Sequence, residues 1–412
     1  MSRLTDFEQY VKIKQIKRKT EETVMPGVKE YIETNGMHSF CDVPFGDADN
    51  LLFCQIFYMP FERVVSESFS AEPVPFPMAC NDVFASRGYQ HKKLGLMIPA
   101  DGSHNIMRMA VQPRFAEMKL VGVKEALSAE PAVQFGAGTF LLPDGTMVIV
   151  YRGTDDTILG WKEDLDIFAR KEIPSYQLAL DYLEKAAAAF DRDIILCGHS
   201  KGGHLALYAA LKTSDAIRSR IRTVYNNDGP GYYDYTLFHT PEYASILPRY
   251  RHLVPHSSFV GMMLSHDYDY TAVRSNVPLG PFQHDLKSWQ IVNGTLQTRP
   301  DVDTLAKITD VALAGIVGKV TDAQAAVVDT VANKLIEATG QVTLTGLVTH
   351  IGSAAGGAVK AWKAVEPQTR KVFKSAFAGA GKILVNTVKN IKAEAQPAAA
   401  KAADMIKNKI FA

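Results

Sequence analysis

The chain has few cysteines, almost no net charge and no long apolar run of the kind that spans a membrane. Its four cysteines show no C-x-x-C spacing and indicate no disulfide framework, so we expect a reducing compartment. The net charge of +1 provides no overall attraction to nucleic acid, and we expect no such partner. Residues 1–20 lack the apolar core of a signal peptide. Residues 338–359 lack charged side chains, but their glycine and threonine content argues against a transmembrane span. We therefore expect a cytoplasmic protein.

The composition is that of a globular protein of one large domain with an appendage. Apolar residues make up 47% of the 412 residues and charged residues 22%, which is ordinary for a folded chain. The composition changes near residue 300, beyond which alanine, valine, threonine and lysine dominate with helical periodicity. We predict a first domain at 1–300, which includes an N-terminal helical extension, and an all-helical region at 301–412.

Strand and helix patterns alternate through the middle of the chain, which predicts an α/β fold with a mostly parallel central sheet flanked by helices. The proline-rich stretch 71–90 is predicted to be a loop, and the apolar run 51–58 fits either a buried helix or a strand. A hairpin turn is expected at 143–145, and a helix at 175–190. Strands are expected at 139–142, 147–151, 193–197, 221–225, 251–255 and 270–275.

The segment Gly198–Gly202 has the sequence Gly-His-Ser-Lys-Gly, which fits the G-x-S-x-G nucleophile elbow. An apolar strand pattern precedes it and an Ala/Leu-rich helix pattern follows it, as that turn requires. The glycines allow a tight strand-to-helix turn that exposes the serine oxygen. We therefore predict that Ser200 is a nucleophile and that the N–H of Lys201 faces a developing oxyanion.

A serine nucleophile needs a base and an acid that orients the base. In α/β-hydrolases these residues follow the serine in the order acid, then histidine. His284 follows the last expected strand in a loop and is the preferred base, with His252, His256 and His266 as weaker candidates. Asp228 ends the strand at 221–225 before a Gly-Pro-Gly turn and is the preferred acid. Asp267 and Asp269 are the alternatives, and a purely structural Asx turn at Asp228 stays open.

The sequence Tyr-Arg-Gly-Thr-Asp at 151–155 ends an earlier strand. A backbone N–H at or near Thr154 is expected to be the second oxyanion donor, beside that of Lys201. Trp161 and Asp164 follow closely and are expected to brace this loop.

Together these segments resemble a known group of enzymes. The Tyr-Arg-Gly-Thr segment with Trp161 and Asp164 is similar to the F-R-G-T…W…D segment of class 3 (fungal-type) lipases. The other segments resemble a bacterial lipase-like group called Mbeg-like, and the resemblance covers roughly residues 30–295. They are Gly-His-Ser-Lys-Gly-Gly, Asn-Asp-Gly-Pro-Gly, Val-Pro-His-Ser-Ser-Phe-Val-Gly and Gln-His-Asp.

The resemblance implies an α/β-hydrolase fold with Ser200 as nucleophile, His284 as base, and Lys201 and Thr154 at the oxyanion hole. One departure concerns the acid, which class 3 lipases carry after the strand that corresponds to 251–255. That place holds His256, Ser257 and Ser258 here, so either the acid has moved to Asp228 or the triad is incomplete.

Two further stretches carry open interpretations. The aromatic-rich stretch 232–248 fits either a lid over the site or ordinary packing. Residues 371–392 form an amphipathic pattern with a lysine face, which fits a helix on an anionic membrane or one docked on the protein. From Lys360 onward there are 11 basic residues against 3 acidic ones.

The sequence thus predicts a serine esterase or lipase that cleaves a carboxylic ester, of a lipid or another acyl substrate, without metal or cofactor. The alternative is a catalytically degenerate hydrolase domain that serves as a binding or membrane-targeting module. A carboxylate hydrogen-bonded to His284 would favour the enzyme.

Overall fold

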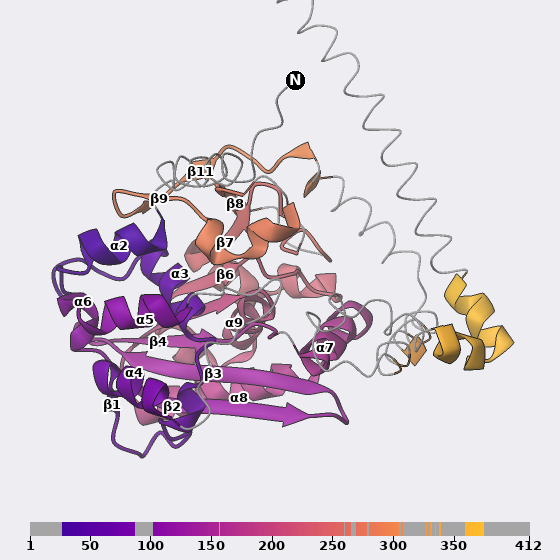
Figure 1. The fold of residues 1–412 in the computed structure, drawn as a ribbon, viewed down its shortest axis with the longest axis horizontal. Helices are drawn as coiled ribbons and strands as arrows, with labels where there is room; N and C mark the ends of the chain where they lie inside the picture. Colours follow the sequence, from indigo (N-terminus) through magenta and orange to yellow (C-terminus); the bar gives the residue numbers. More distant parts are fainter. Residues whose placement is uncertain are drawn as a thin grey trace, which may run out of the picture.

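A computed structural model of the chain describes residues 27–86, 102–155, 157–258, 260–264, 269–277, 280–304, 306–307 and 359–374, together with positions 327, 330, 331, 334 and 338. Most of the described residues form one α/β unit built on a nine-stranded sheet (Figure 1).

The sheet has a parallel half and an antiparallel half. Its strand order is β1-β2-β3-β4-β5-β6-β7-β8-β11. Strands β4 to β8 pair in parallel, whereas β1, β2 and β3 and the edge strand β11 pair antiparallel. The strands are β1 (Val74–Pro75), β2 (Lys119–Ser128), β3 (Val133–Leu141), β4 (Thr146–Tyr151), β5 (Asp193–His199), β6 (Ile221–Asn227), β7 (Tyr250–Pro255), β8 (Tyr270–Val273) and β11 (Thr298–Arg299); β9 (Ile291–Val292) and β10 (Thr295–Leu296) form a separate hairpin.

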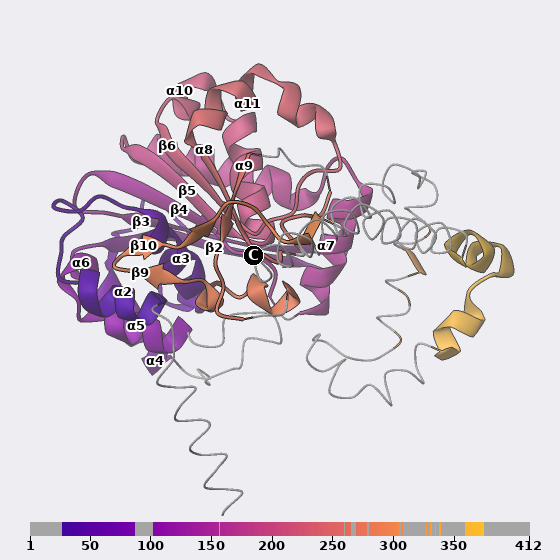
Figure 2. The ribbon, with the colours of Figure 1, turned by 90° about the horizontal axis from the view of Figure 1, so that it is seen from above.

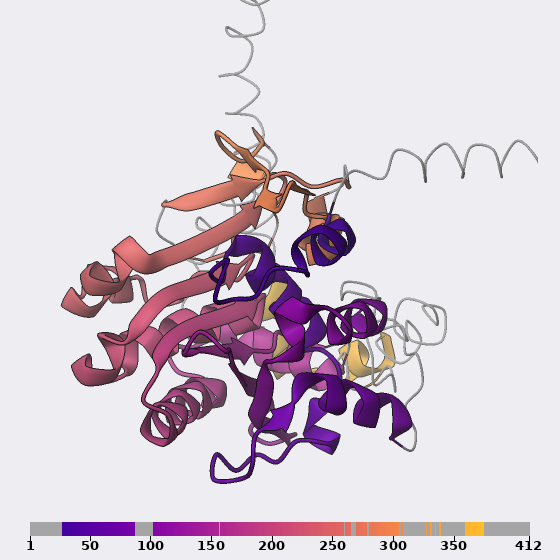
Figure 3. The same ribbon diagram turned by 90° about the vertical axis from the view of Figure 1, so that its left-hand side faces the viewer.

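Helices cover both faces of the sheet (Figure 2). One group precedes β2 along the chain and packs on one face. It consists of α2 (Val28–Asn35), α3 (Asp47–Ile56), α4 (Phe76–Ala85), α5 (Gly102–Ala110) and α6 (Pro113–Ala116), with the 3-10 turn η1 (Phe61–Arg63). The other face carries α8 and α9, and Figure 3 shows the two groups from the side. The later helices are α7 (Ile158–Ala169), α8 (Pro174–Ala189), α9 (Lys201–Lys212), α10 (Asp215–Arg218), η2 (Tyr235–His239), α11 (Pro241–Ile246), η3 (Leu247–Arg249), η4 (Gly280–His284) and η5 (Leu286–Ser288).

The central strands β4 and β5 are mostly apolar because each contributes to two cores. In β4, Val148 and Val150 face the N-terminal helices, whereas Met147 and Ile149 face α8 and α9. Strands covered on both faces lose the usual alternation of polar and apolar residues. This arrangement explains why these strands could be recognised from short apolar runs.

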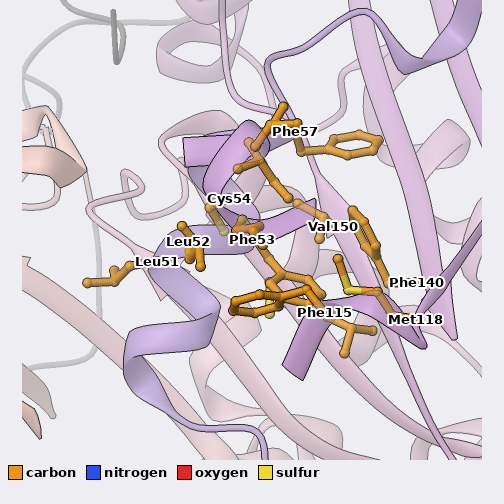
Figure 4. Packing of buried hydrophobic residues seen from close by; sticks show 14 of the residues in the cluster. Leu51, Leu52, Phe53, Cys54, Phe57, Phe115, Met118, Phe140 and Val150 are labelled. Atoms are coloured by element: carbon orange, nitrogen blue, oxygen red, sulfur yellow. The ribbon is translucent and has the colours of Figure 1, made fainter. Parts of the chain in front are cut away.

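The apolar run at 51–58 belongs to α3 as far as Ile56, and this helix is almost wholly buried against the sheet (Figure 4). Phe53 of α3 meets Phe140 of β3 with ring centroids 4.7 Å apart. Burial of such a side chain contributes about 1.5–3 kcal/mol to the free energy of unfolding. Helix α3 therefore fixes the N-terminal helices to the sheet.

Two expectations about the first half of the chain were wrong or incomplete. The stretch 71–90 is not a loop throughout, because α4 occupies Phe76–Ala85. Pro77 lies in the first turn of α4, where a missing N–H costs no helical hydrogen bond. The sheet is parallel only between β4 and β8, since β2 and β3 form a long antiparallel pair that the alternating pattern did not predict. The expected hairpin between β3 and β4 and the helix at 175–190 are confirmed.

Of the described residues beyond 300, some pack against the sheet and others lie away from it. Val302 and Ala306 belong to an apolar cluster with Val254 of β7 and Ala272 of β8. Residues 359–364 and 367–374 are helical and lie away from the sheet in Figures 1 and 2. The division of the chain at residue 300 stays a prediction.

Candidate active site

Ser200 occupies the sharp turn between β5 and α9. Its φ of 57° and ψ of −131° lie in a region that non-glycine residues rarely adopt, and such strain is typical of functional turns. The Ser200 N–H donates to the carbonyl of Asn227 at 2.9 Å, which ties the turn to the end of β6. A Cβ at Gly202 would lie 2.0 Å from the carbonyl oxygen of Tyr151. The second glycine of the motif is therefore needed for the close approach of α9 to β4.

Asp228 follows directly after β6 and is fully buried with a φ of 52°. Its Oδ1 accepts hydrogen bonds from Ser258 Oγ at 2.5 Å and from the Gly261 N–H at 2.9 Å. Both donors come from the loop after β7, the place from which the resemblance expected the acid. That loop therefore supplies hydrogen-bond donors that hold the carboxylate of Asp228, which follows the preceding strand β6.

His284 ends the 3-10 helix η4, and its ring is buried against Asp228. The distance between His284 Nδ1 and Asp228 Oδ2 is 2.7 Å. A carboxylate only accepts, so Nδ1 carries the proton and Nε2 of the neutral ring keeps a lone pair. Neither His284 Nε2 nor Ser200 Oγ has a hydrogen-bond partner among the residues that the structure describes.

Two adjacent residues at the end of β6, Asn227 and Asp228, bring Ser200 and His284 to the same end of the sheet. Asn227 accepts from Ser200, and Asp228 holds His284. On the other side, His199 Nε2 lies 2.8 Å from the carbonyl oxygen of His284, and the two histidine rings have centroids 4.4 Å apart. The structure thus pairs Asp228 and His284, the predicted acid and base, and ties the backbone of Ser200, the predicted nucleophile, to Asn227 beside them.

The loop after β4 passes beside the elbow. A Cβ at Gly153 would lie 3.1 Å from Ser200 Cβ, so only glycine lets the loop come this close. Within the described part of the chain, the backbone N–H groups of Thr154 and Lys201 donate no hydrogen bond. Lys201 is the first residue of α9, where the helix supplies no acceptor for the N–H.

Asp164 braces this loop as expected. Its Oδ1 accepts from the Thr154 hydroxyl at 2.7 Å, and burial raises the pKa of Asp164 to about 6. The side chain of Trp161, the other residue expected here, lies outside the described residues.

The side chain of Lys201 points into a buried polar cluster that the sequence did not reveal. Its Nζ donates to Glu163 Oε2 at 2.7 Å and to the carbonyl of Gln134 at 2.7 Å, and both ionic side chains are almost fully buried. Glu163 also accepts from the Gln134 N–H and the Ser175 hydroxyl. This ion pair joins the start of α9 to α7, α8 and β3 beneath the elbow.

The remaining candidate residues do not join Asp228 and Ser200. His252 is buried inside β7, and Asp269 is exposed before β8. His256 packs beside Gln283, with their side-chain nitrogens 3.1 Å apart, and burial lowers its pKa. His266 and Asp267 lie outside the described residues.

The aromatic stretch 232–248 packs against the helices rather than standing free. Tyr232, Tyr243 and Ile246 are buried in the core that contains α8 and α9. The ring of Tyr232 stacks on His204 with centroids 4.2 Å apart. Tyr235 is the exception, since it is 51% exposed.

Sequence reasoning missed three residues that shape the site, namely Tyr58, Ser258 and Glu163. Each acts across a long stretch of sequence: Tyr58 lies 141 positions before His199, whose Nδ1 is 3.1 Å from its hydroxyl. All three lie in segments already noted, since Tyr58 ends the apolar run at 51–58, Glu163 lies between Trp161 and Asp164, and Ser258 belongs to the segment after 251–255. No local pattern marks their roles.

Across the part of the chain with described positions, no group of three or more histidine, cysteine or acidic side chains could hold a metal ion. In the same part, no helix is both long and apolar enough to cross a bilayer.

Comparison with known proteins adds one family. The model of the family described as Mbeg1-like matches residues 109–332, more than half of the chain, and this range contains Ser200, Asp228 and His284. A search among curated proteins found no match.

Proposed function

The chain belongs to the Mbeg1-like family, and from that membership and the geometry around Ser200 we propose that it is a serine hydrolase of the α/β-hydrolase type that cleaves carboxylic esters. The observation that carries this proposal is the hydrogen bond between His284 Nδ1 and Asp228 Oδ2, beside a serine in a strained backbone conformation whose hydroxyl has no partner among the described residues. Class 3 lipases, which the sequence resembles, carry the acid one strand later.

In the proposed reaction, Ser200 Oγ attacks the ester carbonyl carbon and gives its proton to His284 Nε2. The carbonyl oxygen becomes an oxyanion that accepts from the N–H groups of Lys201 and Thr154. His284 returns the proton to the alkoxide as the C–O bond breaks, which leaves an acyl-enzyme and an alcohol. Water then attacks the acyl group, with His284 as base, and releases the acid and free Ser200.

The proposed substrate is a lipid or another acyl ester. Phe282 lies two residues before His284 and is 48% exposed, so an apolar side chain stands near the base. An acyl chain that packs against this side chain removes apolar surface from water, which favours its binding. We therefore expect hydrolysis to depend on acyl-chain length.

The second candidate, a degenerate domain that only binds, receives less support. A binding module has no need of a strained serine or of a base nitrogen left without a partner. Asp228 uses both its oxygens, one of them on His284, which is the arrangement a working triad requires.

The test is hydrolysis of p-nitrophenyl esters of increasing acyl length by the wild type and by Ser200→Ala. The control is Ser219→Ala, which removes an exposed serine hydroxyl outside the site. We expect the wild type and the control to turn over equally and Ser200→Ala to be inactive with an unchanged circular dichroism spectrum. Equal turnover by Ser200→Ala would contradict the proposal.

A further inference from the structure

The ring of His199 sits between two groups that belong to distant parts of the chain. It is 2% exposed, with Nδ1 3.1 Å from the hydroxyl of Tyr58 and Nε2 2.8 Å from the carbonyl oxygen of His284. Tyr58 follows α3 on the N-terminal face and is also buried. His199 therefore links the N-terminal layer to the backbone that carries the base.

The hydrogen bonds define the tautomer of His199. A carbonyl oxygen only accepts, so Nε2 must carry a proton and donate to His284. Burial and the neighbouring His284 ring lower the pKa of His199 well below its usual range, so the ring is neutral. Nδ1 then has a lone pair, and the Tyr58 hydroxyl donates to it. Tyr58 thus selects the tautomer that can hold His284.

His284 is consequently held at two points. Asp228 fixes the ring through Nδ1, and His199 fixes the main chain through the carbonyl oxygen. The ring of His199 also lies against the ring of His284, with centroids 4.4 Å apart and an interplanar angle of 37°. A base held at only one point could rotate away from the serine, and a shift of about 1 Å can cost about 100-fold in rate.

His199 also directly precedes the nucleophile, so the end of β5 positions both Ser200 and His284, the partners of the proposed proton transfer. His199 is the last residue of β5, and Ser200 begins the turn. Any movement of the elbow is passed to the backbone of His284 through the Nε2 hydrogen bond.

We propose that His199, oriented by Tyr58, is a positioning residue that sets the base His284 against Ser200. The proposal rests on the proposed hydrolase function and adds two residues to its machinery. Neither residue touches the substrate; both act through His284.

Three variants test this. His199→Phe keeps a ring but removes the donor, and we expect kcat to fall about 100-fold with KM little changed. His199→Gln places an amide nitrogen four bonds from Cα, as Nε2 is, and is expected to recover most of that loss. Tyr58→Phe should lower kcat by roughly tenfold, because Nδ1 loses its donor. Combined with His199→Gln, Tyr58→Phe should have little further effect.

A spectroscopic readout separates this role from simple loss of folding. The proton shared by His284 Nδ1 and Asp228 should give a downfield proton resonance, identified by its absence in Asp228→Asn. We expect the signal to persist in wild type and His199→Gln and to broaden or vanish in His199→Phe. If His199→Phe does not fold, the smaller change Tyr58→Phe is measured in the same way.

The proposal is wrong if His199→Phe and Tyr58→Phe keep the resonance and the wild-type kcat per folded molecule. The resonance needs no turnover, so it tests His199 even if no ester is hydrolysed. A wild type that hydrolyses no ester would refute the hydrolase proposal. An unchanged resonance in His199→Phe and Tyr58→Phe would refute the positioning role.

Discussion

Two of the buried polar centres in the described part of the chain are satisfied to different degrees. In the first, among the N-terminal helices, Arg114 donates from Nε and Nη2 to the two oxygens of Asp49 at 2.9 and 2.6 Å. Its Nη1 donates to the carbonyl of Val43 at 2.9 Å, and Tyr31 donates to the same carboxylate. In the second, around Ser200, the acid is fully bonded, but the serine oxygen, one base nitrogen and two amides have no partner among the described residues.

The difference indicates what each centre does. A buried group that is fully hydrogen-bonded contributes to stability and has nothing left to offer a ligand. Buried groups left unpaired cost free energy, and they persist where a substrate or transition state completes them. The first centre should therefore affect folding, and the second should affect turnover.

The largest expected effect is on turnover, from Asp228→Asn. The amide cannot hold His284 in the required tautomer, and loss of an orienting acid in such triads lowers kcat about 10⁴-fold. The thermal midpoint should change far less than turnover does. Asp269→Asn, at an exposed position before β8, is the matched control and should turn over normally. If instead Asp269→Asn is inactive and Asp228→Asn is active, the acid has been misassigned.

The next effect is on folding, from Arg114→Met. The guanidinium is 1% exposed, and its removal leaves the carboxylate of Asp49 buried without its main partner. Breaking such a pair costs about 3–5 kcal/mol in the free energy of unfolding. Urea unfolding measures the loss, and turnover per folded molecule should stay as in the wild type. If Arg114→Met instead lowers turnover without lowering the free energy of unfolding, the distinction between the two centres is wrong.

A third prediction concerns the pH dependence of stability. Burial lowers the pKa of His204 to about 4 and lowers the pKa of His199 well below its usual range. In the unfolded chain histidine titrates near about 6.5, so protons favour unfolding below that pH. The contribution of these two histidines to stability is therefore fully present above about pH 6.5. The part due to His204 falls between pH 6.5 and 4, by up to about 1.4 kcal/mol per pH unit, and the raised pKa of Asp164 opposes this fall below about pH 6.

The variant that tests this is His204→Asn, whose side-chain nitrogen can replace Nδ1 opposite the carbonyl of Pro230. It should reduce the slope of unfolding free energy against pH, and the exposed His239→Asn is the control. An unchanged slope in His204→Asn would show that the acid sensitivity arises elsewhere.

The smallest effect concerns a region that belongs to neither centre. Residues 359–374 carry five basic side chains and one acidic one, and the rings of Trp362 and Phe373 meet at 5.3 Å. The predicted amphipathic stretch continues through residues 375–392, which lie outside the described residues. We expect binding to anionic liposomes, with about 1 kcal/mol lost for each lysine replaced by glutamine at positions 360, 363, 371 and 374. Equal sedimentation of the fourfold variant and the wild type would favour a helix docked on the protein.

Local patterns predicted the parts of the fold that depend on local chemistry. The elbow, the hairpin between β3 and β4 and the helix α8 follow from turn residues and periodicity within short windows. Asp228 was proposed as the acid because it ends a strand before a Gly-Pro-Gly turn, and His284 as the base because it lies in a loop after the last expected strand. The structure brings these two residues within hydrogen-bonding distance.

The features that escaped prediction depend on contacts between distant segments. Helix α4 was concealed by prolines, which are tolerated because they precede the helix or lie in its first turn. Asp49 and Arg114 are 65 positions apart, and Lys201 and Glu163 are 38 apart. A buried ion pair gives no local signal, since either residue alone suggests an exposed surface.

The central claim is that Ser200 is a nucleophile activated by His284. It is tested most directly by treating the protein with a fluorophosphonate probe and mapping the labelled peptide by mass spectrometry. We predict a single adduct on Ser200, labelled slowly in Asp228→Asn and not at all in Ser200→Ala. An unlabelled wild type, or an adduct that persists in Ser200→Ala, would contradict the account.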